Sequence, residues 1–115
     1  MMFTLPLPVP VNEAYKVGRG HLYKSKEAKE WEEEAGYKLL AQNKGKTMLE
    51  GSVYVGLSFF FPDSMKDIDG GIKPVLDLLQ RLRVYKNDRQ VDHLNVQKFL
   101  DKKNPRLEVE VEKLS

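Results

Sequence analysis

Val53-Tyr-Val-Gly-Leu-Ser-Phe-Phe-Phe61 is the clearest β-strand in the chain, and Pro62 closes it. Apolar side chains at every second position alternate with Tyr54, Gly56, Ser58 and Phe60. Because successive side chains of a strand point to opposite faces, this alternation places one apolar set on a single face. We therefore expect that face to be buried and the rest of the chain to cover it.

Two amphipathic helices are predicted around this strand. Ser25 is suited to cap a helix that runs to about Gln42, whose buried stripe would comprise Ala28, Trp31, Ala35 and Leu39. A second helix is predicted over about 70–83, with an apolar face of Ile72, Val75, Leu76, Leu79 and Leu82. A polar turn is expected at 85–89, directly after this helix.

Three further strands complete the predicted fold. Residues 3–8 suit an edge strand because their prolines lack backbone donors, whereas 91–100 and 106–114 form two strands joined by 101–105. Residues 12–24 are expected to be a loop. The order β-α-β-α-β-β predicts an α+β fold, in which two helices pack on one face of a small mixed sheet.

Composition fits a single domain spanning residues 1–115. The chain has 115 residues, 41% hydrophobic and 31% charged, and no cysteine, so disulfides and thiolate metal sites are excluded. The N-terminus lacks the basic start and long apolar run of a signal peptide, and no run approaches the roughly 20 residues of a membrane span. We expect a cytoplasmic protein without a membrane partner.

An acidic segment follows the central strand: Asp67-Ile-Asp-Gly-Gly-Ile-Lys73. Asp67 and Asp69 are two residues apart, so in an extended segment their side chains point the same way. Lys73 lies one helical turn beyond Asp69, and Asp88 lies in the turn after the helix. Asp88 can join the other two aspartates only if the chain doubles back, so that the next strand begins beside Asp67.

Electrostatics indicates what three such carboxylates would do together. Two carboxylates about 4 Å apart repel by roughly 4 kcal/mol at an effective dielectric constant near 20, so either a cation binds or a carboxyl group is protonated. All-oxygen ligands favour Mg²⁺, with Mn²⁺ as a substitute, and such a cation suits phosphodiester hydrolysis. The alternative is that Asp-X-Asp caps the helix and that the Asn-Asp pair at 87–88 merely forms a turn.

A second candidate site is basic. Residues 12–29 contain two acidic residues and five cations: Lys16, Arg19, Lys24, Lys26 and Lys29. These cations could meet DNA phosphates while Tyr15, His21 or Tyr23 stack on unpaired bases, and Lys66 beside the acids could also touch phosphate. The alternative is a solvated loop leading into a helix.

The acidic segment, Val84-Tyr-Lys-Asn-Asp-Arg-Gln-Val91 and Lys98 together resemble the signature of the RusA-type Holliday junction resolvases. That family carries Asp-X-Asp-Asn-X-X-Lys, an aspartate on the helix, an Asp-Asp-X-Gln turn and a strand lysine. The resemblance implies that the catalytic metal ligands are Asp67, Asp69 and Asp88, beside an essential lysine at Lys73. It assigns a more structural character to Asp77 and Gln90.

The resemblance also implies partners and a cofactor. Its members are Mg²⁺-dependent homodimers, largely of phages and prophages, that place paired nicks across four-way DNA junctions in recombination and repair. The strand lysine, Lys98, joins Lys16, Arg19, Lys24 and Lys66 as an expected DNA-contacting cation.

This sequence departs from the family pattern at three positions. Gly70 replaces the asparagine after the second aspartate, Asn87 replaces the first residue of the Asp-Asp pair, and Arg83 stands where a helix-ending glycine is usual. These departures bear on metal affinity and rate more than on the class of reaction. Two alternatives to a junction resolvase stay open: a non-catalytic DNA-binding or replication-accessory module, and a nuclease that acts on other branched DNA.

Overall fold

A four-stranded mixed sheet forms the body of the protein in a computed structural model that describes residues 1–10, 13, 15–18 and 21–114. Its strands are β1 (Met2–Leu5), β4 (Val53–Phe61), β5 (Val91–Leu100) and β6 (Arg106–Lys113), in the spatial order β1-β6-β4-β5. β4 is parallel to β5 and antiparallel to β6, and β6 is antiparallel to β1. The predicted central strand and the predicted edge position of the first strand are confirmed.

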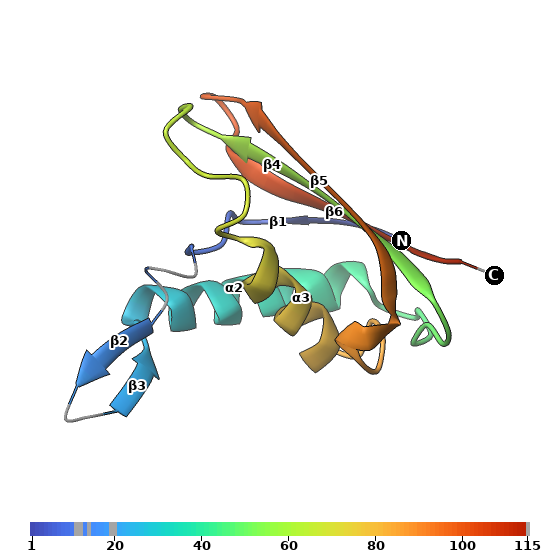
Figure 1. Cartoon of the computed structure of the whole chain (residues 1–115). Coiled ribbons are helices and arrows are strands. Elements are labelled where there is room, and N and C mark those ends of the chain that lie inside the picture. The colour runs from blue at the N-terminus through green and yellow to red at the C-terminus, as the bar shows by residue number, and fades with distance from the viewer. Residues whose placement is uncertain (11–12, 14, 19–20, 115) are drawn as a thin grey trace.

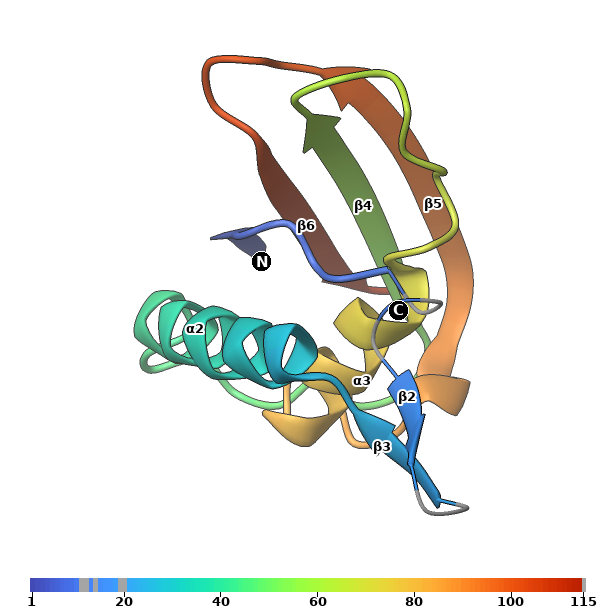
Figure 2. The same cartoon turned by 90° about the vertical axis from the view of Figure 1, so that its left-hand side faces the viewer.

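Both long helices cover the same face of this sheet (Figures 1 and 2). α2 (Lys26–Gln42) connects the N-terminal region to β4, and α3 (Ile72–Arg81) connects β4 to β5. The α+β prediction with two helices on one face is therefore confirmed. Within the described part of the chain, no helix is long and apolar enough to cross a membrane.

The core lies between the helices and the inner face of the sheet. Alternate residues of β4 are buried, and Ser25 caps α2 by accepting a hydrogen bond from the Ala28 amide at 3.2 Å. The expected stripe of α2, Ala28, Trp31, Ala35 and Leu39, is buried as a whole. The Trp31 indole donates to the carbonyl oxygen of Pro6 at 2.9 Å, which fixes the exit of β1 against α2.

The segment 12–24 is not the loop that we predicted. β2 (Tyr15–Gly18) and β3 (His21–Lys24) pair antiparallel as a two-stranded hairpin that projects from the body of the molecule (Figure 1). The strands are four residues each, too short for a clear alternation of apolar and polar side chains. None of the described core residues belongs to this hairpin.

α3 is shorter than the predicted helix over 70–83. It ends at Arg81 because Arg83 adopts a positive φ of 62°, which breaks the right-handed helix. Leu78, which lay outside the predicted apolar face, is buried, whereas Leu76 is half-buried. Tyr85 also differs from expectation, because the predicted polar turn begins with a side chain that is 0% exposed.

Candidate active site

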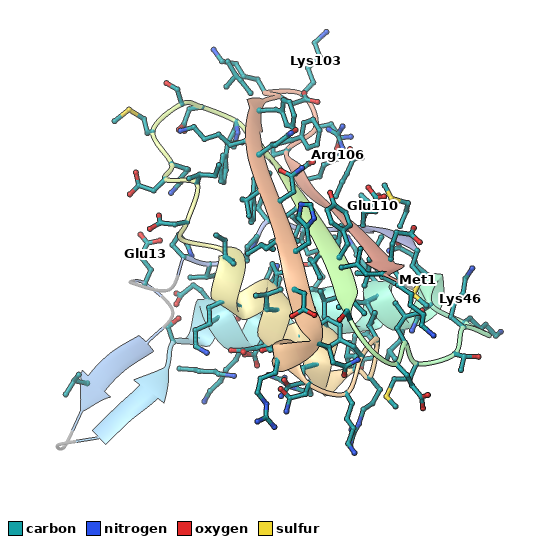
Figure 3. The ribbon with its side chains drawn as sticks, turned by 45° about the vertical axis from the view of Figure 1, so that its right-hand side comes forward. Met1, Glu13, Lys46, Lys103, Arg106 and Glu110 are labelled. Carbon is teal, nitrogen blue, oxygen red and sulfur yellow. The ribbon has the colours of Figure 1, made fainter. Side chains whose placement is uncertain are left out.

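Asp67 and Asp69 lie in the segment that connects β4 to α3, and both are exposed. Asp69 precedes the helix, and its carbonyl oxygen accepts a hydrogen bond from the Ile72 amide at 3.3 Å. The two aspartates line one hollow together with Pro10, Glu13, Met65, Lys66 and Gly70. Glu13 lies beside this segment in Figure 3. The two aspartates of the Asp-X-Asp motif therefore border the same open surface.

Lys98 reaches this segment from β5. Its ammonium group donates a hydrogen bond to the carbonyl oxygen of Lys66 at 2.9 Å. The predicted strand lysine and Lys66 therefore meet directly beside Asp67, although 32 residues separate them in sequence.

Two glycines allow the prolines after β1 to pack closely on the start of α3. A Cβ atom at position 71 would lie 2.7 Å from Cγ of Pro8 and 2.9 Å from Cε1 of Phe59, distances that real Cβ atoms essentially never show. A Cβ atom at position 70 would lie 3.1 Å from Cβ of Pro10, which is a tight contact. The departure at Gly70 thus has a local packing reason, since an asparagine there would crowd Pro10.

Asp88 is held at the other end of α3 by a short 3₁₀ turn, η1 (Asp88–Gln90). The Asn87 side chain accepts from the Arg89 amide at 2.9 Å, and Gln90 Oε1 accepts from the Asn87 amide at 2.9 Å. This capping box gives Asn87, the second departure, a function that an asparagine or aspartate performs equally well. Gln90 also donates to the Gly51 carbonyl oxygen at 2.9 Å, which ties η1 to the segment before β4.

The strand after η1 does not begin beside Asp67. β5 is parallel to β4 and starts opposite Val53, whereas Asp67 follows the end of β4. Instead, Asp88 contacts α3: its backbone amide donates to Oε1 of Gln80 at 2.7 Å, and the Tyr85 hydroxyl lies 2.8 Å from its Oδ1. The chain does double back, but it brings Asp88 beside the C-terminal half of α3, next to Gln80 and Asp77, rather than beside Asp67.

Asp88 lies beside an ion pair that Lys73 and Asp77 form on α3. The Lys73 ammonium lies 3.5 Å from Oδ2 of Asp77, one helical turn further on. Burial raises the pKa of Asp88, and the charge of Asp77 together with a hydrogen bond between the two carboxyl groups acts in the same direction. The Tyr85 hydrogen bond and the Lys73 charge oppose these effects, yet the pKa of Asp88 stays above its ordinary value. Burial is thus the main cause of the raised pKa, and the nearby charge of Asp77 adds to it.

The predicted site residues are thus brought together in two groups. Asp67, Asp69, Lys66 and Lys98 surround the start of α3, and Asp88 joins Lys73, Asp77 and Tyr85 along the helix. Nowhere in the described ranges do three or more His, Asp or Glu side chains gather into a set that could hold a metal ion. Each group contains two carboxylates, and carboxylate oxygens are ligands of the kind that Mg²⁺ takes, since this ion usually binds one or two carboxylates and keeps several waters.

Three residues around Asp88 were not predicted as functional: Tyr85, Gln80 and Asp77. Asp77 could have been found, because Asp69, Lys73 and Asp77 recur at intervals of four residues. Tyr85 and Gln80 carry no such signal, because their contacts with Asp88 depend on how the chain turns after α3.

The predicted DNA-contacting cations differ in their surroundings. Lys24 forms an ion pair with Glu32 of α2, so its charge is already partly neutralised. Lys66 is exposed beside the acidic segment. Arg19 lies outside the described residues, as do the side chains of Lys16, Tyr15, His21 and Tyr23, so these predictions stay predictions.

Comparison with known proteins identifies the family. A model of the family described as Endodeoxyribonuclease RusA matches residues 6–112, a range that includes both acidic groups. The crossover junction endodeoxyribonuclease RusA of Aquifex aeolicus (strain VF5) is 27% identical over 103 residues, covering 88% of this chain and 81% of that protein. The match extends over most of the sequence, from the prolines after β1 into the last residues of β6, and so the chain belongs to the RusA family of endodeoxyribonucleases.

Proposed function

We propose that this protein is a Mg²⁺-dependent endodeoxyribonuclease that resolves four-way DNA junctions by paired nicks, acting as a homodimer in recombination and repair. The observation that supports it best is the convergence of Asp88, Asp77 and Lys73 on α3 inside the region that matches the family. A closed dimer suits the substrate, because a four-way junction has approximate two-fold symmetry and each subunit can act on one strand.

The residues have distinct tasks in this proposal. Asp67 and Asp69 at the start of α3, and Asp88 beside Asp77, are the carboxylates that would offer oxygen ligands to Mg²⁺, which when bound supplies positive charge for the phosphate oxygens and lowers the pKa of a water molecule. Lys73 offers its ammonium group to the scissile phosphate or to the attacking water. Tyr85 and Gln80 fix the position of Asp88 through its carboxylate and its backbone amide.

A synthetic four-way junction tests the proposal directly. Purified protein is expected to nick two opposed strands in Mg²⁺ or Mn²⁺ and to leave the junction intact in EDTA. Asp69→Asn should keep junction binding and lose cleavage, because it removes one charge and alters no core contact. Near-normal nicking by Asp69→Asn in Mg²⁺ would overturn the assignment of this acid.

One observation favours a second candidate, a non-catalytic DNA-binding module. No three potential ligands gather in the described part of the chain, as a preformed metal cage would require. This candidate predicts junction binding that does not depend on Mg²⁺ and no cleavage of any branched DNA. Including a flap and a splayed duplex in the same assay separates it from a nuclease with a different branched substrate.

A further inference from the structure

A hollow with a basic rim lies at the C-terminal end of α3. It is lined by Asp77, Gln80, Arg81, Arg83 and Lys86, so three cations face a single acid. Asp77 belongs to both this hollow and the group around Asp88. We call the surface formed by Arg81, Arg83 and Lys86 the basic groove. It therefore adjoins one half of the candidate active site.

Arg83 occupies this groove in a backbone conformation that costs free energy. Its φ is 62°, in the left-handed region where side chains other than glycine are disfavoured. The Arg83 amide donates to the Gln80 carbonyl oxygen at 3.1 Å, and the Val84 amide donates to that of Leu79 at 3.0 Å. These two bonds form a Schellman motif, whose left-handed position is most often glycine. The chain thus places a long cation where folding alone favours glycine.

The charges of the groove are mostly available to a ligand. Neither the Arg83 guanidinium nor the Lys86 ammonium forms an ion pair with a residue that the structure describes, and both residues are exposed. Arg81 is held by Glu32 at 3.3 Å, which fixes its position at the edge of the groove. Asp77, the acid of the lining, is already paired with Lys73.

We propose that the basic groove binds the phosphate backbone of a DNA arm next to the cleavage site, with Arg83 as its principal contact. The inference rests on the proposed function, because DNA is the polyanion that the acidic groups would act on. A phosphate contact explains both the unpaired cations and the strained position of Arg83, since strain is retained where function requires it. The competing explanation is that cations at this helix end only complement the helix dipole.

Two substitutions at position 83 separate these explanations. Arg83→Gly removes the charge and the strain, and Arg83→Asn removes the charge while keeping a side chain that tolerates this conformation. Arg83→Gly is expected to raise the melting temperature by about 3–6 °C. Both variants should weaken junction binding about five- to tenfold at 0.1 M salt. They should also lower the salt slope, which is the steepness with which the logarithm of the binding constant falls with the logarithm of the salt concentration, by about 0.9, the contribution of one phosphate contact.

Lys103→Gln provides a matched loss of one positive charge elsewhere. Lys103 lies in the turn between β5 and β6 (Figure 3), and the 10 residues of β5 separate that turn from η1 by roughly 30 Å. The Lys103→Gln variant should bind the junction with the salt slope and dissociation constant of the wild type. A double variant, Arg83→Asn with Lys86→Gln, should lower the slope by about 1.8.

The outcomes distinguish this inference from the proposed function. If Arg83→Gly melts higher but binds the junction with wild-type affinity and salt slope, the basic groove does not contact DNA, whether or not the wild type cleaves. If binding weakens as expected while the wild type does not cleave in Mg²⁺, the groove is supported and the proposed nuclease activity fails. A wild type that binds no DNA overturns both.

Discussion

The Tyr85 hydroxyl lies 2.8 Å from Oδ1 of Asp88, at the end of a side chain that is 0% exposed. Burial raises the pKa of Tyr85, and the hydrogen bond and charge of Asp88 raise it further. Because its pKa is raised, the hydroxyl is protonated at neutral pH and can donate to the carboxylate. A rigid aromatic ring in the core thus fixes the orientation of a half-buried acid at the surface.

Replacing Tyr85 with phenylalanine should impair the use of Mg²⁺ while leaving DNA binding intact. Tyr85→Phe keeps the buried ring and deletes the donor, so the free energy of unfolding should fall by about 1 kcal/mol. Groups that orient a metal ligand typically affect metal affinity or activity by 10–100-fold. We expect the Mg²⁺ concentration for half-maximal cleavage of a four-way junction to rise about tenfold.

Tyr37→Phe is the matched control for this experiment, because Tyr37 lies on α2 and is 70% exposed. It should change neither stability nor the Mg²⁺ titration. A Tyr85→Phe variant that also titrates like the wild type would show that Asp88 needs no orientation by Tyr85.

Asp77 is expected to act in the site rather than only in the helix. Asp77→Asn removes the negative charge nearest to Asp88 and also the partner of Lys73. Losing the ion pair lowers the free energy of unfolding, and relieving the repulsion raises it. Without Mg²⁺, the free energy of unfolding should therefore change by less than about 0.5 kcal/mol. Cleavage should nevertheless fall at least about tenfold, measured at saturating DNA.

Glu34→Gln is the corresponding control on α2. It breaks an ion pair of the same spacing, in which Lys38 lies 3.1 Å from Glu34, far along the chain from both acidic groups. Its cleavage rate should equal that of the wild type. Equal rates for Asp77→Asn as well would leave Asp77 with the structural character that the family resemblance implies.

Local patterns were sufficient to predict the elements on which the fold depends. The strand Val53–Phe61 has the predicted bounds, and α2 begins after its predicted cap at Ser25, because alternation and capping act within a few residues. The end of α3 could not be predicted in this way. It is set by the positive φ of Arg83, a residue type that gives no signal for the left-handed conformation.

The candidate site was predicted only in part, because its geometry depends on contacts between distant segments. Spacing identified Asp67, Asp69 and Lys73 on either side of the start of α3. The position of Asp88 follows from the burial of Tyr85, which forms a bridge with Leu49 ahead of β4. A sequence window around residue 88 contains no information about Leu49, so Asp88 was expected beside Asp67 and lies beside Asp77.

The hairpin formed by β2 and β3 should be needed for DNA binding but not for folding. Val17, the apolar residue of β2 whose exposure the structure describes, is 77% exposed, so we expect that replacing residues 15–22 with a short Gly-Ser linker shifts the melting temperature by less than about 3 °C. The replacement removes Lys16 and Arg19, and the salt slope of junction binding should fall by about 1.8 if each contacts one phosphate.

A double variant, Lys16→Gln with Arg19→Gln, tests the charges with the hairpin kept. It should reproduce the change in salt slope. If it binds like the wild type while the linker variant does not, the hairpin acts through shape or stacking, and the predicted phosphate contacts are wrong.

Glu32 should make the stability of the protein depend on pH in acid. Burial raises the pKa of Glu32, but hydrogen bonds and charges from Lys24 and Arg81 outweigh this and hold the pKa below its ordinary value of 4.5. The folded state therefore binds a proton less readily than the unfolded state, and the stabilisation is complete above the unfolded pKa. It is lost as the pH falls through the folded pKa. Glu32→Gln should reduce the free energy of unfolding by about 1 kcal/mol at pH 7, and its difference from the wild type should shrink toward pH 3.

Urea unfolding at several pH values between 7 and 3 measures this difference. Glu30→Gln is the control, because Glu30 is exposed on the same helix and lies 3.9 Å from Lys26 in a solvent-screened pair, so its curve should follow the wild type closely. A constant gap between Glu32→Gln and the wild type at all pH values would mean that Glu32 stabilises the protein by packing. A difference in the free energy of unfolding that disappears in acid would mean that the charge of Glu32 is what stabilises the protein. Through its ion pairs with Lys24 and Arg81, that charge connects β3, α2 and α3 and positions Arg81 at the edge of the basic groove.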